Sequence, residues 1–327
     1  MTPKFQLPSL PTLSRSTTTR SEATRKAPDL LDHLWKSGHL LLIDPKGRTP
    51  VTRDLSSLAL RETTGDRPDN AWLLGELDDI SYWAQPIDVE LAQLPAPATS
   101  FTFWSGAQSA TGEQWHDLRG IGAHLDGIHA GIFTAAAGLS NWHARARFCA
   151  RCGSPTTVTS AGWATTCTGC SREEYPRTDP AVICLVHDTE GPNGEHVLLA
   201  TGANWPAGRY SVLAGFVETG ESLEACVERE IAEEVGVQVR DVRYLGSQPW
   251  PFPRSIMIGF AATADRDAPI TPADGEIDTA RWMSRTEVRE ILDHGGRHND
   301  IVLAGGASIA RLMIESWASG ATTRTPG

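Results

Sequence analysis

Three glutamates stand close together in the segment 222–235 and form the most distinctive chemical feature of the chain. If this segment is a helix, Glu230, Glu233 and Glu234 fall within an arc of about 100°. Like charges at this spacing repel one another and lower the stability of the helix. Divalent cations remove that penalty, and carboxylate oxygens suit Mg²⁺ or Mn²⁺. The segment therefore predicts a catalytic Mg²⁺ or Mn²⁺ site.

The residues around these glutamates indicate how the helix is positioned. Gly236 follows at the place where a helix usually ends. Arg229 is spaced to reach back to Glu221 and brace the preceding loop; the alternative is a surface ion pair, which would contribute little to stability. An apolar stripe that packs against a core recurs every fourth residue, at Leu223, Val227, Ile231 and Val235.

Four cysteines form a second cluster, arranged as two Cys-x-x-Cys pairs separated by fourteen residues. Four thiolates close a tetrahedral structural zinc site, which leaves no position open for chemistry. The gap between the pairs is slightly shorter than usual. A redox dithiol and plain buried cysteines are the alternatives, and nearby arginines also allow a ribbon that binds nucleic acid. The cysteines are Cys149, Cys152, Cys167 and Cys170, and the arginines are Arg145, Arg147 and Arg151.

The segment 247–255, which reads Ser-Gln-Pro-Trp-Pro-Phe-Pro-Arg-Ser, is a candidate binding loop. Its three prolines fix φ and stiffen the backbone. The two aromatic rings are then held out for stacking at a low cost in entropy. The alternative is a proline-rich connection at the edge of a sheet.

Length and composition exclude several classes of protein. A chain of 327 residues favours two folded units. Its 40% hydrophobic and 21% charged residues exclude a wholly disordered chain, a coiled coil or a collagen-like repeat. No run approaches the roughly 18 apolar residues of a membrane span. The net charge of −11 opposes long-range attraction to nucleic acid or anionic lipid. The paired cysteines and the lack of an N-terminal signal segment favour a cytoplasmic location.

The elements that would position these residues indicate an α/β/α sandwich, because strand-like runs are mixed with two helices. Residues 1–28 carry five Lys/Arg against a single acid and are expected to form a disordered tail; an organellar transit peptide is the alternative. The expected strands are 181–186, 196–200, 239–245, 256–262 and 279–283, and the expected helices are 222–235 and 307–317. The expected domains are an α+β accessory domain at 29–140, a zinc ribbon at 141–176, the sandwich at 177–317 and a disordered tail at 318–327.

The segment 215–237 resembles the Nudix box, Gly-x5-Glu-x7-Arg-Glu-U-x-Glu-Glu-x-Gly-U with U aliphatic, and every fixed position is filled. The cysteine ribbon, the run 175–180 (Tyr-Pro-Arg-Thr-Asp-Pro) and the Ser-Gln-Pro-Trp segment are together similar to the NADH pyrophosphatase subfamily of Nudix hydrolases. This resemblance implies a mixed-sheet Nudix fold preceded by a diverged N-terminal domain. It also implies hydrolysis of NAD(H) to NMN(H) and AMP, removal of NAD caps from RNA 5′ ends, and a homodimer. An inactive homologue is the alternative.

The resemblance also implies roles for individual residues. Glu230, Glu233 and Glu234 would hold the catalytic cations together with Glu276 and the Ala214 carbonyl, and Glu233 or Glu234 would act as the general base. Phe216 and Tyr175 would sandwich the nicotinamide, with Tyr175 supplied by the partner subunit. A backbone group near Ala310 would meet the adenosine end. The remaining substrate residues would be Gln248, Pro249, Trp250, Pro251, Phe252, Pro253, Arg254 and Ser255.

Two departures and two rival functions stay open. Arg254 stands where some relatives carry Gln, and it would either contact phosphate or face solvent. Gly162 lies near the place of an acid that some relatives use for substrate contact, so no such acid is assigned. The rivals are a broader Nudix pyrophosphatase acting on ADP-ribose or other nucleoside diphosphate derivatives, and a non-catalytic protein that binds dinucleotide or RNA.

Overall fold

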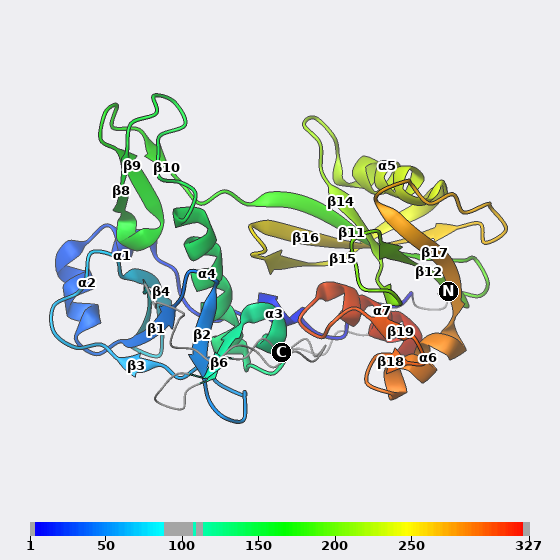
Figure 1. Ribbon diagram of the computed structural model, residues 1–327, viewed down its shortest axis with the longest axis horizontal. Helices are drawn as coiled ribbons and strands as arrows, with labels where there is room; N and C mark the ends of the chain where they lie inside the picture. Colours follow the sequence, from blue (N-terminus) through cyan, green and yellow to red (C-terminus); the bar gives the residue numbers. More distant parts are fainter. Residues whose placement is uncertain (1–3, 88–106, 109–113, 323–327) are drawn as a thin grey trace. The chain divides into compact units, whose positions relative to one another are not determined.

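The computed structural model describes residues 4–87, 107–108 and 114–322. The chain divides into two compact units (Figure 1). Unit 1 comprises residues 1–14, 179–249 and 255–327, and unit 2 comprises residues 15–178 and 250–254. Within the described ranges, no helix has both the length and the apolar character needed to cross a bilayer.

Unit 1 is built on a mixed sheet of β11 (Asp179–His187), β12 (His196–Gly202), β14 (Leu213–Phe216), β15 (Val239–Trp250), β16 (Ser255–Ala264) and β17 (Ile277–Ser284). The strand order is β15-β16-β11-β12-β17, and β14 pairs with β11. β11 and β16 are parallel, whereas the β11–β12, β11–β14 and β12–β17 pairs are antiparallel. The sequence predicted all of these strands except β14, which is too short to show alternation.

Helices cover both faces of this sheet, and they are α5 (Leu223–Val235), α6 (Arg285–Asp293) and α7 (Ile309–Ser319). Successive side chains of a strand point to opposite faces. Cys184 of β11 therefore joins Ile231 of α5 in one core, whereas its neighbour Ile183 joins Met313 of α7 in the other. Figure 1 shows α5 on one face and α6 and α7 on the other. The predicted Nudix α/β/α sandwich is confirmed.

Short elements complete unit 1. The small strands β13 (Arg209–Tyr210), β18 (Arg297–His298) and β19 (Ile301–Leu303) form a sheet in the order β13-β19-β18. A 3₁₀ turn, η1, spans Thr12–Ser14.

Unit 2 contains the accessory α+β elements, in two small sheets of order β3-β1-β5-β4 and β2-β7-β6. Pro28 starts one helix at a position where its missing N–H costs nothing, and the Asp126 carboxylate caps another by accepting from His129 N at 2.8 Å. The helices are α1 (Glu22–Arg25), α2 (Pro28–Trp35), α3 (Leu118–Ile121) and α4 (Gly127–His143). The strands are β1 (His39–Ile43), β2 (Arg48–Val51), β3 (Arg61–Glu62), β4 (Trp72–Leu77), β5 (Ile80–Pro86), β6 (Ala107–Gln108) and β7 (Gln114–Asp117).

The ribbon that follows is a three-stranded sheet of order β10-β9-β8. Its elements are β8 (Thr156–Thr159), the 3₁₀ turn η3 (Ser160–Gly162), β9 (Ala164–Cys167) and β10 (Glu173–Glu174).

The prediction of a disordered tail at 1–28 is wrong for its described part. Phe5 is fully buried and Leu7 is 4% exposed, and both join the core of unit 1. The backbone N–H of Phe5 donates to Asn193 Oδ1 at 2.8 Å. The average composition hid these apolar residues, which bury enough surface to offset the entropy of ordering the segment.

The predicted C-terminal tail at 318–327 also begins too early. α7 continues to Ser319, and Ala318 is buried. The Ala321 carbonyl accepts a hydrogen bond from the N–H of Gln6 at 2.7 Å. Residues 323–327 lie outside the described residues, so that part of the prediction stays untested.

Candidate functional site

α5 carries the predicted glutamates, and its two ends are set by local contacts. The Ser222 hydroxyl caps the helix by accepting from Ala225 N at 3.2 Å. Gly236 ends it in the left-handed conformation, with φ of 74°, which glycine adopts without strain. Of the predicted apolar stripe, Val227, Ile231 and Val235 are buried at 0 to 1% exposure, and Leu223 is partly buried against the same core. This packing fixes α5 against the sheet of unit 1 and thereby positions the glutamates.

The first glycine of the motif allows β14 to approach α5 closely. Gly215 pairs with Val182 of β11, so its backbone position is fixed by the sheet. A Cβ atom built on Gly215 would lie 1.8 Å from the carboxyl carbon of Glu230. Any side chain at this position would displace that carboxylate. The sequence motif marked this glycine, but its contact with Glu230 is visible only in the fold.

Glu234 is the most perturbed acid of the group. Burial raises the pKa of Glu234 to about 8, and the negative charges of Glu230 and Glu276 add to this effect. A backbone hydrogen bond from Ala214 acts in the opposite direction. Its Oε2 atom is buried and has no hydrogen-bond partner among the described residues. A buried, unsatisfied carboxylate oxygen of this kind is costly unless a cation or donor binds there.

Glu230 and Glu276 complete the acidic surroundings of Glu234. Burial also raises the pKa of Glu230, although Arg229 opposes the shift. Glu276 is exposed. The segment that contains it lies beside the C-terminal end of α5, because Ala273 N donates to the Glu234 carbonyl at 2.9 Å. The predicted grouping of Glu230, Glu234, Glu276 and Ala214 is thus present in unit 1.

Arg229 organises the rest of the motif. It makes a bidentate pair with Glu221, with Nε–Oε1 at 2.8 Å and Nη2–Oε2 at 2.9 Å. Its Nη1 lies 2.9 Å from Glu233 Oε2 and 3.0 Å from Glu230 Oε1. Its Nη2 also donates to the Phe216 carbonyl at 3.0 Å. Arg229 therefore braces the loop before the helix, as predicted, and also holds two of the glutamates.

The Glu221–Arg229 pair leads to a prediction about pH. Hydrogen bonds from Arg229 and from Glu218 N lower the pKa of Glu221 to about 2. We expect the Glu221 carboxyl carbon signal in an NMR titration to move with a midpoint near 2. In Arg229→Gln the midpoint should return toward the ordinary value of 4.5. A wild-type midpoint near 4.5 would contradict the pairing.

The residues present fit divalent cations. The donors are carboxylate oxygens and a backbone carbonyl, which hard cations prefer. The buried Glu234, whose Oε2 has no partner among the described residues, is close enough to Glu230 and Glu276 for their charges to raise its pKa. Among the described residues, the glutamates of α5 are not a cluster whose ligand atoms all lie within 4.8 Å of one another; Glu230 and Glu233 contact Arg229 instead.

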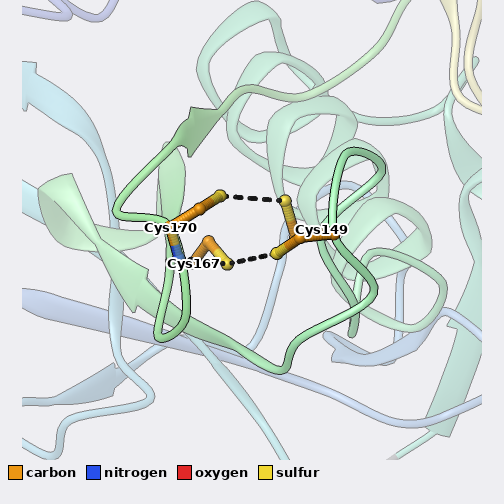
Figure 2. A group of neighbouring side chains, drawn as sticks. Cys149, Cys167 and Cys170 are labelled. Atoms are coloured by element: carbon orange, nitrogen blue, oxygen red, sulfur yellow. Dashed lines mark hydrogen bonds between the residues drawn. The ribbon is translucent and has the colours of Figure 1, made fainter.

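The predicted zinc ligands come together in unit 2. The ligand atoms of Cys149, Cys152, Cys167 and Cys170 all lie within 4.8 Å of one another. The Sγ–Sγ distance is 3.7 Å for Cys149–Cys170 and 3.4 Å for Cys152–Cys167. Figure 2 shows Cys149 on one loop of the ribbon pointing toward Cys167 and Cys170 on another. Backbone N–H groups point at the sulfur atoms, for example from Gly169 to Cys167 at 3.3 Å. This closed set of four thiols suits a structural zinc ion.

The two aromatic residues predicted to stack on nicotinamide are both exposed. Phe216 is 59% exposed in unit 1, and Tyr175 is 61% exposed in unit 2. The Tyr175 hydroxyl donates to Glu173 Oε2 at 2.9 Å. Exposed rings of this size are available for stacking, so both assignments stay predictions.

The proline-rich segment differs from the expectation of freely projecting rings. Trp250 and Phe252 contact each other edge to face, with centroids 4.8 Å apart, and the Arg119 guanidinium lies 4.3 Å from the Phe252 ring centroid. Asn141 Nδ2 donates to the Pro251 carbonyl at 2.7 Å. These partners lie more than a hundred residues earlier in the chain, so the local sequence did not reveal them.

The other predicted substrate residues vary in exposure. Gln248 is fully buried, its Nε2 donates to the Ala307 carbonyl at 2.9 Å, and its Oε1 has no described partner. Ala310 is buried, and its N–H donates to the capping hydroxyl of Ser308. The burial of Gln248 and Ala310 favours a structural contribution from these two residues. Among the rest, Ser255 is buried, Arg254 is half-buried, and the exposed residues are Pro249 and Pro253.

Sequence reasoning missed one further cluster of potential ligands, Asp188, Glu190 and His196. Asp188 is 2% exposed, and it accepts hydrogen bonds from Glu195 N at 2.7 Å and from His196 Nδ1 at 2.8 Å. The Arg266 guanidinium lies against the same groups, 2.7 Å from His196 Nδ1. Because Arg266 and the backbone N–H groups are its partners, the cluster stabilises the turn between β11 and β12. The only sequence signal was an acid at the end of a buried strand.

Comparison with known proteins agrees with the geometry. Residues 177–303 match the NUDIX domain model, and residues 144–175 match the NADH pyrophosphatase zinc ribbon domain model. The NAD-capped RNA hydrolase NudC of Mycobacterium bovis is 41% identical over 322 residues, which is 96% of this chain and 97% of the relative. NudC of Stutzerimonas stutzeri is 40% identical over 62% of this chain and 67% of its own. A solved Nudix hydrolase from Nitrosomonas europaea has 22% identity, covers 55% of this chain and 96% of its own, and gives a TM-score of 0.42. The chain therefore belongs to the Nudix hydrolase family, in the group that carries the NADH pyrophosphatase zinc ribbon.

Proposed function

We propose that this chain hydrolyses the pyrophosphate of NAD(H) to NMN(H) and AMP and removes NAD caps from RNA 5′ ends. The observation that carries the proposal is the filled Nudix motif on α5, in which the charges of Glu230 and Glu276 raise the pKa of Glu234 and the Ala214 backbone is hydrogen-bonded to it. The relatives named as NAD-capped RNA hydrolases, which match along nearly the whole chain, support the choice of substrate.

The catalytic cation is proposed to be Mg²⁺ or Mn²⁺, held by Glu230, Glu233, Glu234, Glu276 and the Ala214 carbonyl. When bound, such an ion lowers the pKa of water and neutralises charge on the phosphate oxygens.

The protein's own groups then perform three tasks. Arg229 fixes the orientation of Glu230 and Glu233 and ties the loop of Phe216 to the helix. Glu233 or Glu234 accepts the proton of the attacking water. Phe216 and Tyr175 stack on the nicotinamide, which accounts for two large aromatic residues left exposed to solvent.

The assembly and location are also proposals. A homodimer, in which the partner subunit supplies its own copy of this tyrosine, is tested by light scattering of the purified protein. A cytoplasmic location accords with four clustered thiols, which remain free for zinc in a reducing compartment.

Product analysis tests the function directly. We would incubate one preparation with NADH, NAD⁺, ADP-ribose and an NAD-capped RNA, each with Mg²⁺ or Mn²⁺. NMNH and AMP should appear from NADH, and a monophosphorylated RNA should appear from the capped one. A higher kcat/KM for ADP-ribose than for NADH would favour a broader pyrophosphatase. Tight binding of dinucleotide or RNA without any product would favour a non-catalytic role.

Gly215→Ala tests the close approach of β14 to the glutamates. The added Cβ would overlap the Glu230 carboxyl group and push it out of position. Because misplacement of a reacting group by about 1 Å costs on the order of a hundredfold, we expect kcat for NADH to fall by about that factor. Gly305→Ala is the matched control, since a Cβ there meets nothing within 4 Å. Equal kcat values for the two variants would contradict this account.

A further inference from the structure

A partly basic groove runs within unit 2, lined on one side by the ribbon. It consists of two hollows of about 860 and 670 Å³, which share Asn70 and Val158 as lining residues. We call it the ribbon groove. The charged residues of the larger hollow are Arg25, Lys26, Arg67, Asp69 and Glu173, and Arg147 lines the smaller one.

The basic N-terminal segment supplies much of this charge. Instead of forming a tail, it pairs with the accessory sheet, where Thr19 N donates to the Glu76 carbonyl at 2.7 Å. Arg25 of α1, which lines the larger hollow, and Arg20, which precedes α1, lie over one ring of the ribbon. The guanidinium carbons of Arg25 and Arg20 lie 4.0 and 5.6 Å from the centroid of Trp163.

These two arginines have no carboxylate partner among the described residues. Arg20 Nη2 donates to the Ser16 hydroxyl at 3.1 Å, and Arg25 Nη2 donates to the Arg20 carbonyl at 3.4 Å. Arg25 is half-buried and Arg20 is exposed. Burial and the positive charge of Arg20 lower the pKa of Arg25, whereas Glu22 raises it. Two like charges over one ring repel each other, and an anion that binds near them would remove this repulsion. In a chain of net charge −11, such a pair needs an explanation.

The ion-pair partners of the other two cations of the larger hollow are exposed acids. Lys26 Nζ lies 2.7 Å from Glu22, and Arg67 Nη2 lies 2.9 Å from Asp32. Both acids are more than half exposed, so these pairs contribute little and exchange readily for another anion.

The wall formed by the ribbon is held in place by hydrogen bonds. Trp163 Nε1 donates to the Leu73 carbonyl at 2.6 Å, and His143 Nε2 lies 2.8 Å from the Gly162 carbonyl. The groove is therefore preformed, which lowers the entropy cost of binding.

The smaller hollow presents an apolar surface beside a cation. Phe148 is 63% exposed and lies next to Arg147 in the sequence. Cationic grooves with exposed aromatic rings bind single-stranded nucleic acid, because the cations meet the phosphates and the rings stack on the bases.

We propose that the ribbon groove binds the single-stranded RNA that follows the NAD cap, with one phosphate at Arg25 in the larger hollow, a second at Arg20 beside it over the same Trp163 ring, and a base on Phe148. The proposal rests on the proposed function, which supplies a substrate with a phosphodiester chain. Glu173 lines the groove and accepts the hydroxyl of Tyr175, so the groove reaches a residue expected to contact the cap.

The test compares RNA with free dinucleotide in the double variant Arg20→Gln/Arg25→Gln. Binding of an NAD-capped 20-nucleotide RNA is measured by fluorescence anisotropy in buffer without added Mg²⁺ or Mn²⁺ and without chelator, so that no turnover is needed and the zinc of the ribbon is retained. We expect affinity to fall about tenfold or more at low salt. The slope of log K against log salt should become shallower by about 1.4, because each phosphate contact on a single strand contributes about 0.7. kcat/KM for NADH should stay within about twofold of the wild type.

Arg53→Gln is the matched control, because Arg53 is an exposed arginine of unit 2 that neither lines the groove nor lies over Trp163. Phe148→Leu should weaken RNA binding without changing the salt slope. Unchanged RNA affinity and slope in a double variant with wild-type zinc content and Tm would overturn the proposal. An equal loss for NADH and RNA would overturn it as well. Failure of the wild type to hydrolyse NADH would instead refute the proposed function, and the anisotropy measurement would still decide the groove.

Discussion

We expect Glu234→Gln to lower kcat for NADH by about a thousandfold or more while the protein remains folded. The substitution would remove a proposed metal ligand and one of the two candidates for the general base, and a base alone contributes about 10²–10⁴-fold. Gln is close in size to Glu and would be equally buried, so the packing of α5 is preserved. Steady-state kinetics with Mg²⁺ or Mn²⁺ would measure the effect.

The same variant is expected to be more stable than the wild type at high pH when no catalytic metal is bound. The pKa of Glu234 is about 8 when folded and near 4.5 in the unfolded chain. Between pH 4.5 and 8 the folded state therefore binds more protons than the unfolded chain. The contribution of Glu234 to the free energy of unfolding is fully present below pH 4.5 and is lost as the pH rises through 8. Gln never ionises, so Glu234→Gln avoids this loss. We expect its Tm in EDTA at pH 9 to exceed that of the wild type by a few degrees.

Glu228→Gln is the matched control for both measurements. Glu228 lies on the same helix but is exposed, so the Glu228→Gln variant should have the kcat and Tm of the wild type. Near-native turnover in Glu234→Gln would refute its place in the acid group. A lower Tm in EDTA at pH 9 would show that the carboxylate is not strained by burial.

Local patterns in the sequence predicted the parts of the site that local interactions determine. The helix α5 follows from an apolar residue every fourth position and a terminal glycine, and the zinc ligands follow from the spacing of the cysteine pairs. Both are properties of short segments. The closeness of Glu276 to Glu234 came only from the family resemblance, because it depends on how a distant loop returns to the end of the helix.

The parts that the sequence did not reveal depend on partners far apart in the chain. The tail prediction rested on average composition, whereas Phe5 is ordered by contacts with residues nearly two hundred positions later. The aromatic rings of the proline-rich segment were expected to project freely, but Arg119 and Asn141 hold it. Composition and periodicity carry no information about such pairings, so burial and contacts at these places required the fold.

We expect Cys167→Ser to abolish zinc binding and unfold the ribbon. The ribbon has almost no hydrophobic core of its own, because its fully buried apolar side chains are limited to Cys149, Ala164 and Cys167 among the described residues. Zinc binding by domains of this kind supplies on the order of 10 kcal/mol of folding free energy. Metal analysis should show the loss of about one zinc per chain. Hydrogen exchange should show lost protection across residues 144–175.

The sheet of unit 1 has its own two cores and should keep its protection in this variant. Cys184→Ala is the matched control, because Cys184 is a buried cysteine outside the quartet. It should lower the Tm by creating a cavity and retain full zinc content. A ribbon that stays protected in Cys167→Ser would show that packing against the accessory domain, through contacts such as Trp163 with Leu73, holds it without metal. Because those contacts are few, we expect zinc to be decisive.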